Sequence, residues 1–365
     1  MKIIRNYILE EIFTSFIGVL FFLTFILMVG NVFSSMIDLV MNRGVDIFRI
    51  TQVILHTLPF LMMFTIPTAI LVAILLTFGR LSADHELVAL RASGINLRRI
   101  FKPILITAFC LSLFTLYLSD QIAPRSHFKV RQIASEIGLE TPAALLEEGV
   151  FIKSFNDLVI FIHRIDGNIL KQIRIYQPQK DGPTRTIIAE RGEIIPLPEQ
   201  NIIKLKLTNG TSDEPDASNP GGFYKLNFGT YFLPLDISTM KFKGNLDRKR
   251  KERSIKELWT HYAKLTKEGF HDAYALTEIN KRVAAALSTF CFAMIGIPLA
   301  IRTQRGEKSI GFAIALILVT IYWVALIGMA SLGKKEVLSP WIAMHIPNII
   351  YMLLGCILMR KNLKA

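Results

Sequence analysis

The chain has 365 residues, of which 52% are hydrophobic and 19% are charged, and its formal net charge is +13. So large an apolar share excludes an ordinary soluble domain and indicates a membrane protein with several spans. In such a protein the excess of Lys and Arg gathers on the cytoplasmic side, so the positive charge does not point to nucleic acid.

The first third of the chain contains three apolar runs that are long enough to cross a bilayer. We expect spans at 12–37, 50–79 and 103–119, the last of them ended by Asp120. The loop between the second and third spans, residues 79–102, is rich in charge, and its apolar residues recur at helical spacing. This pattern predicts a short amphipathic helix over 82–94, with Ser82 as its N-cap and Gly94 as its C-cap.

This loop helix has two interpretations. It either lies among the lipid headgroups, as interfacial helices do, or it is a coupling helix that docks into a soluble motor protein. The pattern of residues does not separate the two.

Residues 121–275 differ in kind from the apolar runs. After a polar helical segment at 124–138 come short segments of alternating pattern, separated by turn residues such as Asn209-Gly210. The expected strands are 149–155, 158–165, 169–177, 184–190, 201–210 and 222–235. Evenly spaced short strands predict an antiparallel β-sandwich or jelly roll.

Three further apolar runs follow, and they predict spans at 283–301, 309–333 and 337–359. The short segments on the side of the two termini hold 13 Lys and Arg, whereas the loops on the other side hold 4. By the positive-inside rule both termini are cytoplasmic and the β-domain is exported. The predicted fold class is therefore membrane α-helical, with six transmembrane helices in a 3+3 arrangement and an inserted, exported antiparallel β-jelly-roll domain. The expected domains are 1–120, 121–275 and 276–365.

The sequence contains none of the common catalytic motifs, such as a P-loop, a paired Cys motif, HExxH or GxSxG. We expect no metal and no cofactor, and the three cysteines (Cys110, Cys291 and Cys356) lie inside apolar runs, where buried free thiols are the simplest interpretation. The spans hold almost no ionisable residues, which argues against a transporter powered by protons or ions. Energy for any work on a substrate is therefore expected from a partner.

Several cations fall at the outer ends of the spans. They are Arg43, Arg125, Lys281, Arg282, Lys334 and Lys335. One interpretation is snorkelling to lipid headgroups, and the other is recognition of the phosphates of an anionic amphiphile.

Three stretches resemble one known family, the YjgP/YjgQ lipopolysaccharide-export permeases LptF and LptG. They are GRLSADHELVALRASGINLRRI in the first half, then EINKR with GIPLAIRTQRGEKSIGF, and LSPWIAMHIPNIIY in the last span. The resemblance extends over essentially the whole chain, including the β-domain.

The resemblance implies a permease subunit without a catalytic site of its own, in the bacterial inner membrane, with its β-domain in the periplasm. It implies a second permease of the family (LptG or LptF), a dimer of the ABC ATPase LptB, and LptC and LptA as partners that receive lipopolysaccharide. It also makes 82–94 the coupling helix, with Asp84, Glu86, Leu87, Leu90 and Arg91 as the ATPase-coupling residues. The alternative is a non-transporting envelope scaffold whose β-domain binds partner proteins, and a lipid-modifying enzyme is the third, less favoured class.

Overall fold

The computed structural model describes residues 2–30, 46–94, 98–140, 148–155, 158–166, 169–179, 182–197, 202–215, 223–236, 248–302 and 308–364. The chain forms two compact units. The helical unit comprises residues 1–30, 56–128 and 248–365, and the sheet unit comprises residues 31–55 and 129–247.

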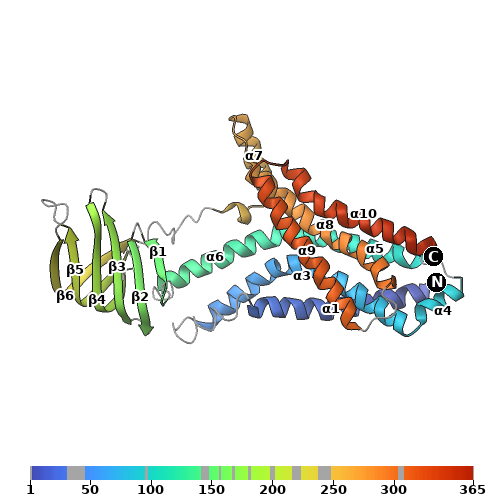
Figure 1. Ribbon diagram of the computed structural model, residues 1–365, viewed down its shortest axis with the longest axis horizontal. Helices are drawn as coiled ribbons and strands as arrows, with labels where there is room; N and C mark the ends of the chain where they lie inside the picture. The colour runs from blue at the N-terminus through green and yellow to red at the C-terminus, as the bar shows by residue number, and fades with distance from the viewer. Residues whose placement is uncertain are drawn as a thin grey trace. The chain divides into compact units, whose positions relative to one another are not determined.

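Six helices among the described residues are long and apolar enough to cross a membrane, as the sequence predicts. They are α1 (Lys2–Met28), α3 (Ile47–Ala83), α5 with its continuation (Arg98–Ile137), α8 (Ala273–Arg302), α9 (Lys308–Lys334) and α10 (Pro340–Lys364). The short helices are α4 (Glu86–Ala92), α7 (Ile255–Lys267) and η4 (Arg250–Glu252). Both termini and α4 lie at one end of the helical unit, and α7 lies at the other (Figure 1). We call these the α4 end and the α7 end.

The helix of the third span does not end at Asp120, where the sequence leads us to expect a break before a separate helical segment at 124–138. The helix α5 (Arg98–Tyr117) passes through a π-helical turn, η2 (Leu118–Ile122), directly into α6 (Ala123–Glu140). Asp120 lies in that turn, and its Oδ1 accepts a hydrogen bond from the backbone N–H of Ile255, 2.5 Å away. The carboxylate of Asp120 thus accepts from one of the backbone N–H groups that lack a partner at the N-terminus of α7. The two residues are 135 positions apart in the sequence.

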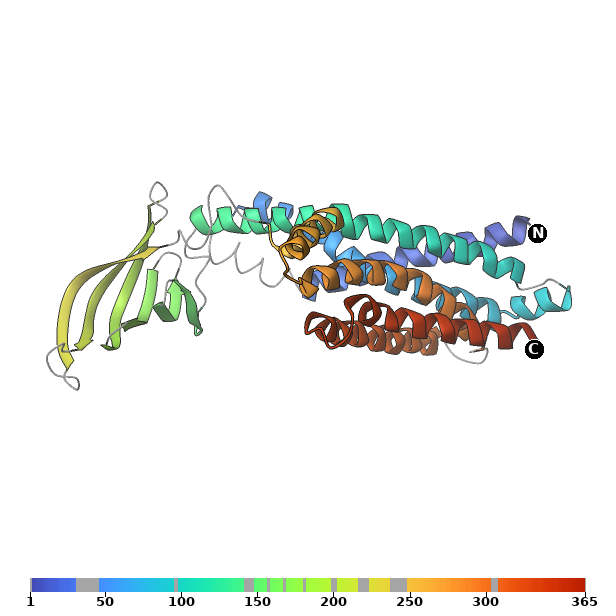
Figure 2. The same ribbon diagram turned by 90° about the horizontal axis from the view of Figure 1, so that it is seen from above.

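The helical unit is built around α3 and α8, which are largely buried, while α1 and α9 expose most of their length. Small residues let the central helices approach closely. A Cβ added to Gly355 of α10 would lie 2.9 Å from the carbonyl oxygen of Met294 on α8, and one added to Gly296 would lie 2.9 Å from Cδ1 of Leu71 on α3. Figure 2 shows these helices running side by side.

A polar network lies inside the apolar core of the unit. The hydroxyl of Tyr322 donates to Oδ1 of Asn348 (2.9 Å), and Nδ2 of Asn348 donates to the backbone oxygen of Ala284 (3.0 Å). Tyr322 and Asn348 are both almost fully buried. Because unpaired polar groups are costly in an apolar core, this network ties α8, α9 and α10 into one arrangement.

The sheet unit contains one six-stranded antiparallel sheet of order β1-β2-β3-β4-β5-β6. The strands are β1 (Phe151–Phe155), β2 (Leu158–Asp166), β3 (Ile169–Gln179), β4 (Gly182–Leu197), β5 (Ile202–Pro215) and β6 (Phe223–Asp236). The inserted antiparallel β-domain is confirmed. In the described strands, however, each pairs with its neighbour in sequence, an up-and-down meander, whereas a jelly roll would need crossing Greek-key connections.

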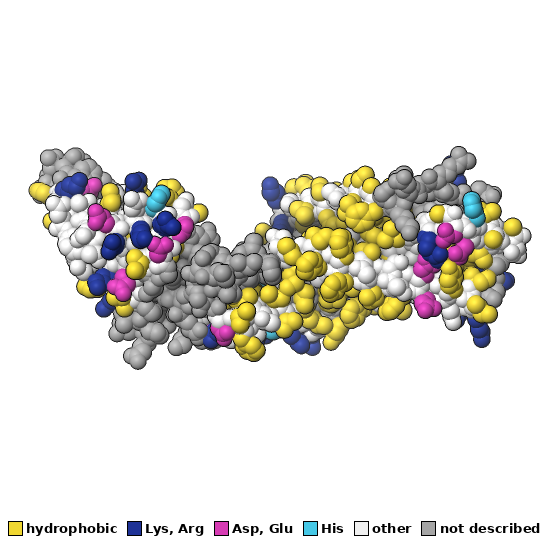
Figure 3. Space-filling view, turned by 90° about the horizontal axis from the view of Figure 1, so that it is seen from below, with side chains coloured by type: hydrophobic (Ala, Val, Ile, Leu, Met, Phe, Trp, Pro, Cys, Tyr) yellow, Lys and Arg dark blue, Asp and Glu magenta, His cyan; other side chains and the backbone are white. Residues whose placement is uncertain are grey.

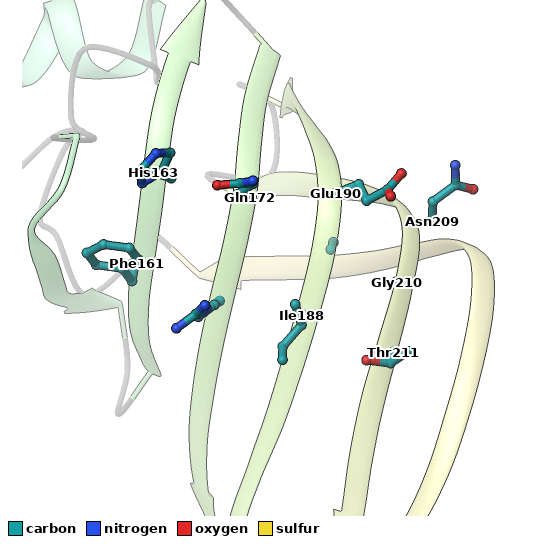
Figure 4. A pocket seen from close by; sticks show the side chains of 10 residues that line it. Phe161, His163, Gln172, Ile188, Glu190, Asn209, Gly210 and Thr211 are labelled. Carbon is teal, nitrogen blue, oxygen red and sulfur yellow. The ribbon is translucent and has the colours of Figure 1, made fainter.

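One face of this sheet carries a buried apolar cluster. Its members alternate along the strands, and they include Ile160, Ile162, Ile173, Ile175, Ile187 and Leu207. The strands curve strongly, and β6 passes behind the others (Figure 4). Alternation that places one buried apolar face opposite a more exposed one is the pattern that the sequence predicts for an antiparallel sheet.

The expectation of a turn at Asn209-Gly210 is wrong. β5 continues through this pair to Pro215, with Ala189 opposite Gly210 on β4. Asn209 does adopt the left-handed conformation typical of turns, with φ 53°. The strand nevertheless continues, because β4 and β6 pair with β5 before and after this residue.

Candidate functional site

The loop between the second and third spans is held by one cation at the α4 end. Arg80, near the end of α3, forms an ion pair with Glu11 of α1 through both Nε and Nη2. Its Nη2 also donates to the hydroxyl of Tyr7 on α1 (2.7 Å), and its Nη1 lies 3.0 Å from Oδ2 of Asp84. One guanidinium therefore joins α1 to the end of α3.

Glu86, the first residue of α4, belongs to the same network. Its Oε1 lies 3.3 Å from Nη1 of Arg80 and accepts a hydrogen bond from the hydroxyl of Tyr7, also at 3.3 Å. Three elements, α1, α3 and α4, thus share one cluster of charges. An Arg with its planar fork suits such a junction, because it can hold several carboxylates at once.

The loop helix differs from the expected 82–94. The helix α3 runs on to Ala83 because Phe78 and Leu81 are fully buried, and Ser82 lies inside α3 instead of capping a new helix. His85, with φ 57°, breaks the chain direction, and α4 begins at Glu86. Gly94 has φ 71°, which confirms it as the residue that ends the helix.

The predicted coupling residues are not all on one surface. Leu87 is buried in the core of the helical unit, and Leu90 packs against that core. Val88, in contrast, is 53% exposed, and Asp84 and His85 are exposed beside it. Arg91 lies on α4, but its side chain is outside the described part of the structure. The surface open to a partner is therefore formed by the turn before α4 and by the side of α4 that bears Val88.

The sequence-based interpretation missed Arg80, Glu11 and Tyr7 as members of this site. Two local signals were present: Arg80 and Asp84 are four residues apart, as are Tyr7 and Glu11, and such pairs share a helix face. Their meeting across 69 residues depends on packing, which the spacing does not reveal.

A second site lies near the α7 end of the helical unit, where a pocket of about 120 Å³ combines aromatic and charged walls. Phe60 and Phe64 of α3 and Trp323 of α9 form the apolar wall. Lys281 and Arg282 of α8, both predicted as lipid-phosphate residues, line the same pocket. Figure 3 shows the setting: hydrophobic side chains cover the middle of the helical unit, and charged ones gather at its ends.

The two neighbouring cations of this pocket have different surroundings. Arg282 is 3% exposed; its Nη1 donates to the carbonyl of Arg253 (2.7 Å) and its Nη2 to that of Lys251 (3.0 Å). Its Nε lies 3.5 Å from Glu278. Lys281 is partly exposed and forms no ion pair among the described residues, since Glu278, which lines the same pocket, pairs with Arg282. Arg282 thus anchors the segment before α7, while the ammonium of Lys281 is open to a ligand.

The other predicted phosphate residues lie apart from this pocket. Arg125 is exposed on α6 and donates to Oε1 of Gln121 (3.1 Å). The ammonium of Lys334 lies 4.8 Å from the ring centroid of Tyr274, and Lys335 is exposed in the turn after α9. Arg43 lies outside the described residues. The structure therefore brings together two of the six predicted cations.

Comparison with known proteins adds to this geometry. The family model "Lipopolysaccharide export system permease LptF/LptG" matches residues 6–361. The chain is 22% identical to the lipopolysaccharide export system permease protein LptF of Escherichia coli (strain K12), with 98% of this chain and 94% of that protein covered. The same identity and coverage hold for LptF of Shigella flexneri. A protein of Rickettsia prowazekii (strain Madrid E) is also 22% identical, with 90% of this chain and 89% of that protein covered. The two relatives with a name in this family are both LptF, which gives a slight preference for LptF over LptG.

Proposed function

We propose, from the premise that the chain belongs to the LptF/LptG family of lipopolysaccharide export permeases, that it is the subunit through which an ABC ATPase drives lipopolysaccharide out of the membrane. The expected partners are an LptB dimer, a second permease of the family, and LptC and LptA as acceptors. The observation that carries the proposal is the charge cluster that links the loop helix α4 to the first span. It offers a mechanical route from a motor protein to the membrane.

Coupling starts at α4 in this proposal. The ATPase docks on the exposed surface around Asp84, His85 and Val88, and its movement displaces α4. Because Glu86 and Glu11 share Arg80, a displacement of α4 pulls on α1. α1 is also the least buried of the six spans, so its movement disturbs less of the core than a movement of α3 or α8 would.

The second permease covers α1 and α9 in this proposal, since these two spans leave most of their apolar surface without a partner inside the chain. A cavity for the lipid then lies between the two permeases. Extraction needs external energy because each CH₂ removed from the bilayer costs about 0.8 kcal/mol, and lipopolysaccharide carries several acyl chains. Closure of an apolar cavity by ATP hydrolysis in the partner supplies that work.

Lys281 is the cation that we assign to a lipid phosphate. It lines a pocket whose apolar wall suits the chain region next to a headgroup. Arg282 acts on the same pocket indirectly, because it holds the backbone at 251–253 in place. For Arg125, Lys334 and Lys335 snorkelling remains the simpler role.

The sheet unit would pass the lipid onward. Its buried apolar face suits acyl chains, and its edge strands, β1 and β6 in the described sheet, can each accept a strand from a neighbouring β-domain. With the orientation that the positive-inside rule gives, both termini and α4 are cytoplasmic and the sheet unit is periplasmic. The membrane is the inner membrane of a bacterium.

The experiment that tests the proposal is affinity purification of the protein from its native membrane, with mass spectrometry of proteins and lipids. Recovery of an ABC ATPase, a second six-span permease and lipopolysaccharide is the expected result. Recovery of the protein with bulk phospholipid alone would contradict the exporter and favour the scaffold alternative. In that case the sheet unit should still capture envelope proteins after the loop 79–102 is replaced.

A further inference from the structure

We call a residue of the sheet inward when its side chain faces the buried apolar cluster and outward when it faces the opposite side. Inward and outward residues alternate along the strands, but this alternation is interrupted at one row that crosses five successive strands. On each strand two outward residues follow one another at this row. The inward residues on the two sides of the interruption are Ile162 and Ile165, Leu170 and Ile173, Ala189 and Gly192, Leu207 and Gly210, and Phe228 and Tyr231. Because every strand carries the same extra residue, the register between neighbours is kept: the ladder pairs Ile162–Ile173 and Arg164–Lys171 bracket the row on β2 and β3.

The backbone at this row is unusual as well. Gln172 on β3 and Asn209 on β5 have φ 52° and 53°, in the left-handed region that residues other than glycine rarely enter. Both residues occupy the same row, since Ile173 pairs with Ala189 and Ala189 with Gly210. Backbone conformations of this kind concentrate at binding and catalytic sites, where the surrounding structure maintains them.

A pocket of about 490 Å³ opens at the row. Phe161, Arg174 and Ile188 stand between inward-facing neighbours, so they point to the face opposite the buried apolar cluster. Figure 4 shows His163, Gln172, Glu190 and Asn209 following one another across four strands, with Phe161, Ile188 and Thr211 in a parallel row.

The polar side chains of the pocket are available to a ligand. They are His163, Gln172, Arg174, Glu190, Asn209 and Thr211. Within the described part of the chain, no hydrogen-bond or ion-pair partner engages any of these six side chains. Six such groups on one surface, aligned across strands about 4.8 Å apart, form a ladder of donors and acceptors.

The chemistry of this ladder selects the class of ligand. The amides of Gln172 and Asn209 can both donate to and accept from adjacent hydroxyls, and the carboxylate of Glu190 accepts from them. Arg174 can hold an anionic substituent, and Phe161 offers an apolar face to a ring. A purely apolar ligand would leave the polar groups unpaired, and a simple anion would be repelled by Glu190.

We propose that this row is a binding site for an extended saccharide that carries an anionic substituent. Two sources supply that chemistry: the sugar portion of the exported glycolipid, an assignment that rests on the proposed function, and the glycan of the cell wall, which does not. The site is separate from the apolar face of the sheet and from both sites of the helical unit.

The test uses the full-length protein in lipid nanodiscs and two lipid-free probes, measured by isothermal titration calorimetry. One probe is the phosphorylated core oligosaccharide released from lipopolysaccharide by mild acid, and the other is the N-acetylglucosamine–N-acetylmuramic acid disaccharide. Glu190→Gln and Arg174→Ala should each weaken binding about tenfold, as expected for one lost hydrogen bond to a charged group. Lys225→Ala, which removes an exposed cation of β6 outside the pocket, should leave affinity unchanged.

Binding of the core oligosaccharide alone would assign the site to the exported substrate, and binding of the disaccharide alone to the cell wall. Binding of neither probe, or affinity unchanged in both pocket variants, would overturn the proposal. Whether the ATPase co-purifies with the protein tests the export function separately. The pocket variants should not affect it, since Arg174 and Glu190 belong to the sheet unit and not to the helical unit.

Discussion

The guanidinium of Arg80 on α3 forms an ion pair with the carboxylate of Glu11 on α1, and its Nη1 lies 3.3 Å from Oε1 of Glu86 on α4. The segment that is expected to meet the ATPase is thus attached to the least buried span through Arg80 and through the Tyr7 hydroxyl, which donates to Glu86. A change at Arg80 should affect both the stability of the helical unit and the transmission of movement.

Arg80→Ala should lower the free energy of unfolding by about 1 kcal/mol, a modest value because the Arg80 and Glu11 side chains are 33% and 18% exposed. Thermal unfolding in detergent, with Glu11→Gln as the second arm of a double-mutant cycle, measures the coupling. Arg125→Ala, an exposed cation on α6, is the control. Strictly additive effects of Arg80→Ala and Glu11→Gln would show that the pair does not stabilise the fold.

Substitutions at Leu87 and Val88, which are adjacent on α4, should affect different properties: Val88 the binding of the ATPase and Leu87 the stability of the fold. Val88→Asp changes an exposed side chain, so the protein should unfold at its normal temperature but lose its ATPase during purification. Leu87→Ala removes a buried side chain, and it should cost about 2–5 kcal/mol of stability. Retention of the ATPase by Val88→Asp would place the docking surface elsewhere.

Lys281 and Arg282 allow a similar contrast at the α7 end. Lys281→Ala should leave thermal stability unchanged and reduce the amount of lipopolysaccharide that co-purifies, since its ammonium has no ion-pair partner among the described residues. Arg282→Ala should lower stability by about 3 kcal/mol, because Glu278 and two carbonyls lose a buried cation. Mass spectrometry of bound lipid and thermal unfolding measure the two effects, and the pattern would be refuted by equal losses of stability.

Two glycines should differ in their tolerance of a methyl group. Gly355→Ala brings a Cβ to 2.9 Å from the carbonyl oxygen of Met294, so α8 and α10 must separate, at a cost of about 1–3 kcal/mol. Gly328→Ala, on α9, meets nothing within 4 Å and should be neutral or slightly stabilising. Unfolding of both variants in detergent provides the comparison; a stable Gly355→Ala would mean that the two helices can adjust.

The left-handed residue of β5 offers a prediction about the sheet. Asn209→Val should destabilise the sheet unit by about 1–2 kcal/mol, because a β-branched residue is strained at φ 53°. Asn209→Gly should be tolerated, since glycine enters this region freely. Hydrogen exchange of the β5 amides reports the difference, and faster exchange in the glycine variant than in the valine variant would contradict the reasoning.

The regular elements of this protein follow from local pattern. Six apolar runs and six alternating segments predict the existence and order of the spans and the strands, because span length and strand alternation are local patterns. The bounds are less accurate: α1 begins at Lys2 instead of 12, α8 at Ala273 instead of 283, and β4 continues to Leu197 instead of 190. The exceptions are positions where tertiary packing overrides the local signal. Asn209-Gly210 reads as a turn but lies inside a strand, and Ser82 reads as a helix start but lies inside α3.

The candidate sites were harder to predict. Lys281 and Arg282 are adjacent and carry the same charge, yet carbonyls at 251 and 253 engage only Arg282. Glu11 and Arg80 are far apart in sequence. The interruption of the alternation, by contrast, is visible in the sequence as two polar residues between apolar ones, as in Ile162-His163-Arg164-Ile165. Its meaning emerges only when five strands are aligned.

That alignment also restricts how the sheet can change over evolutionary time. Removal of the extra residue from one strand alone would turn half of that strand over, so that its apolar side chains faced water and its polar ones faced the cluster. Five matching deletions would be needed to remove the row without loss of the fold. We therefore expect related chains to differ in which side chains occupy the row more readily than in whether the row exists.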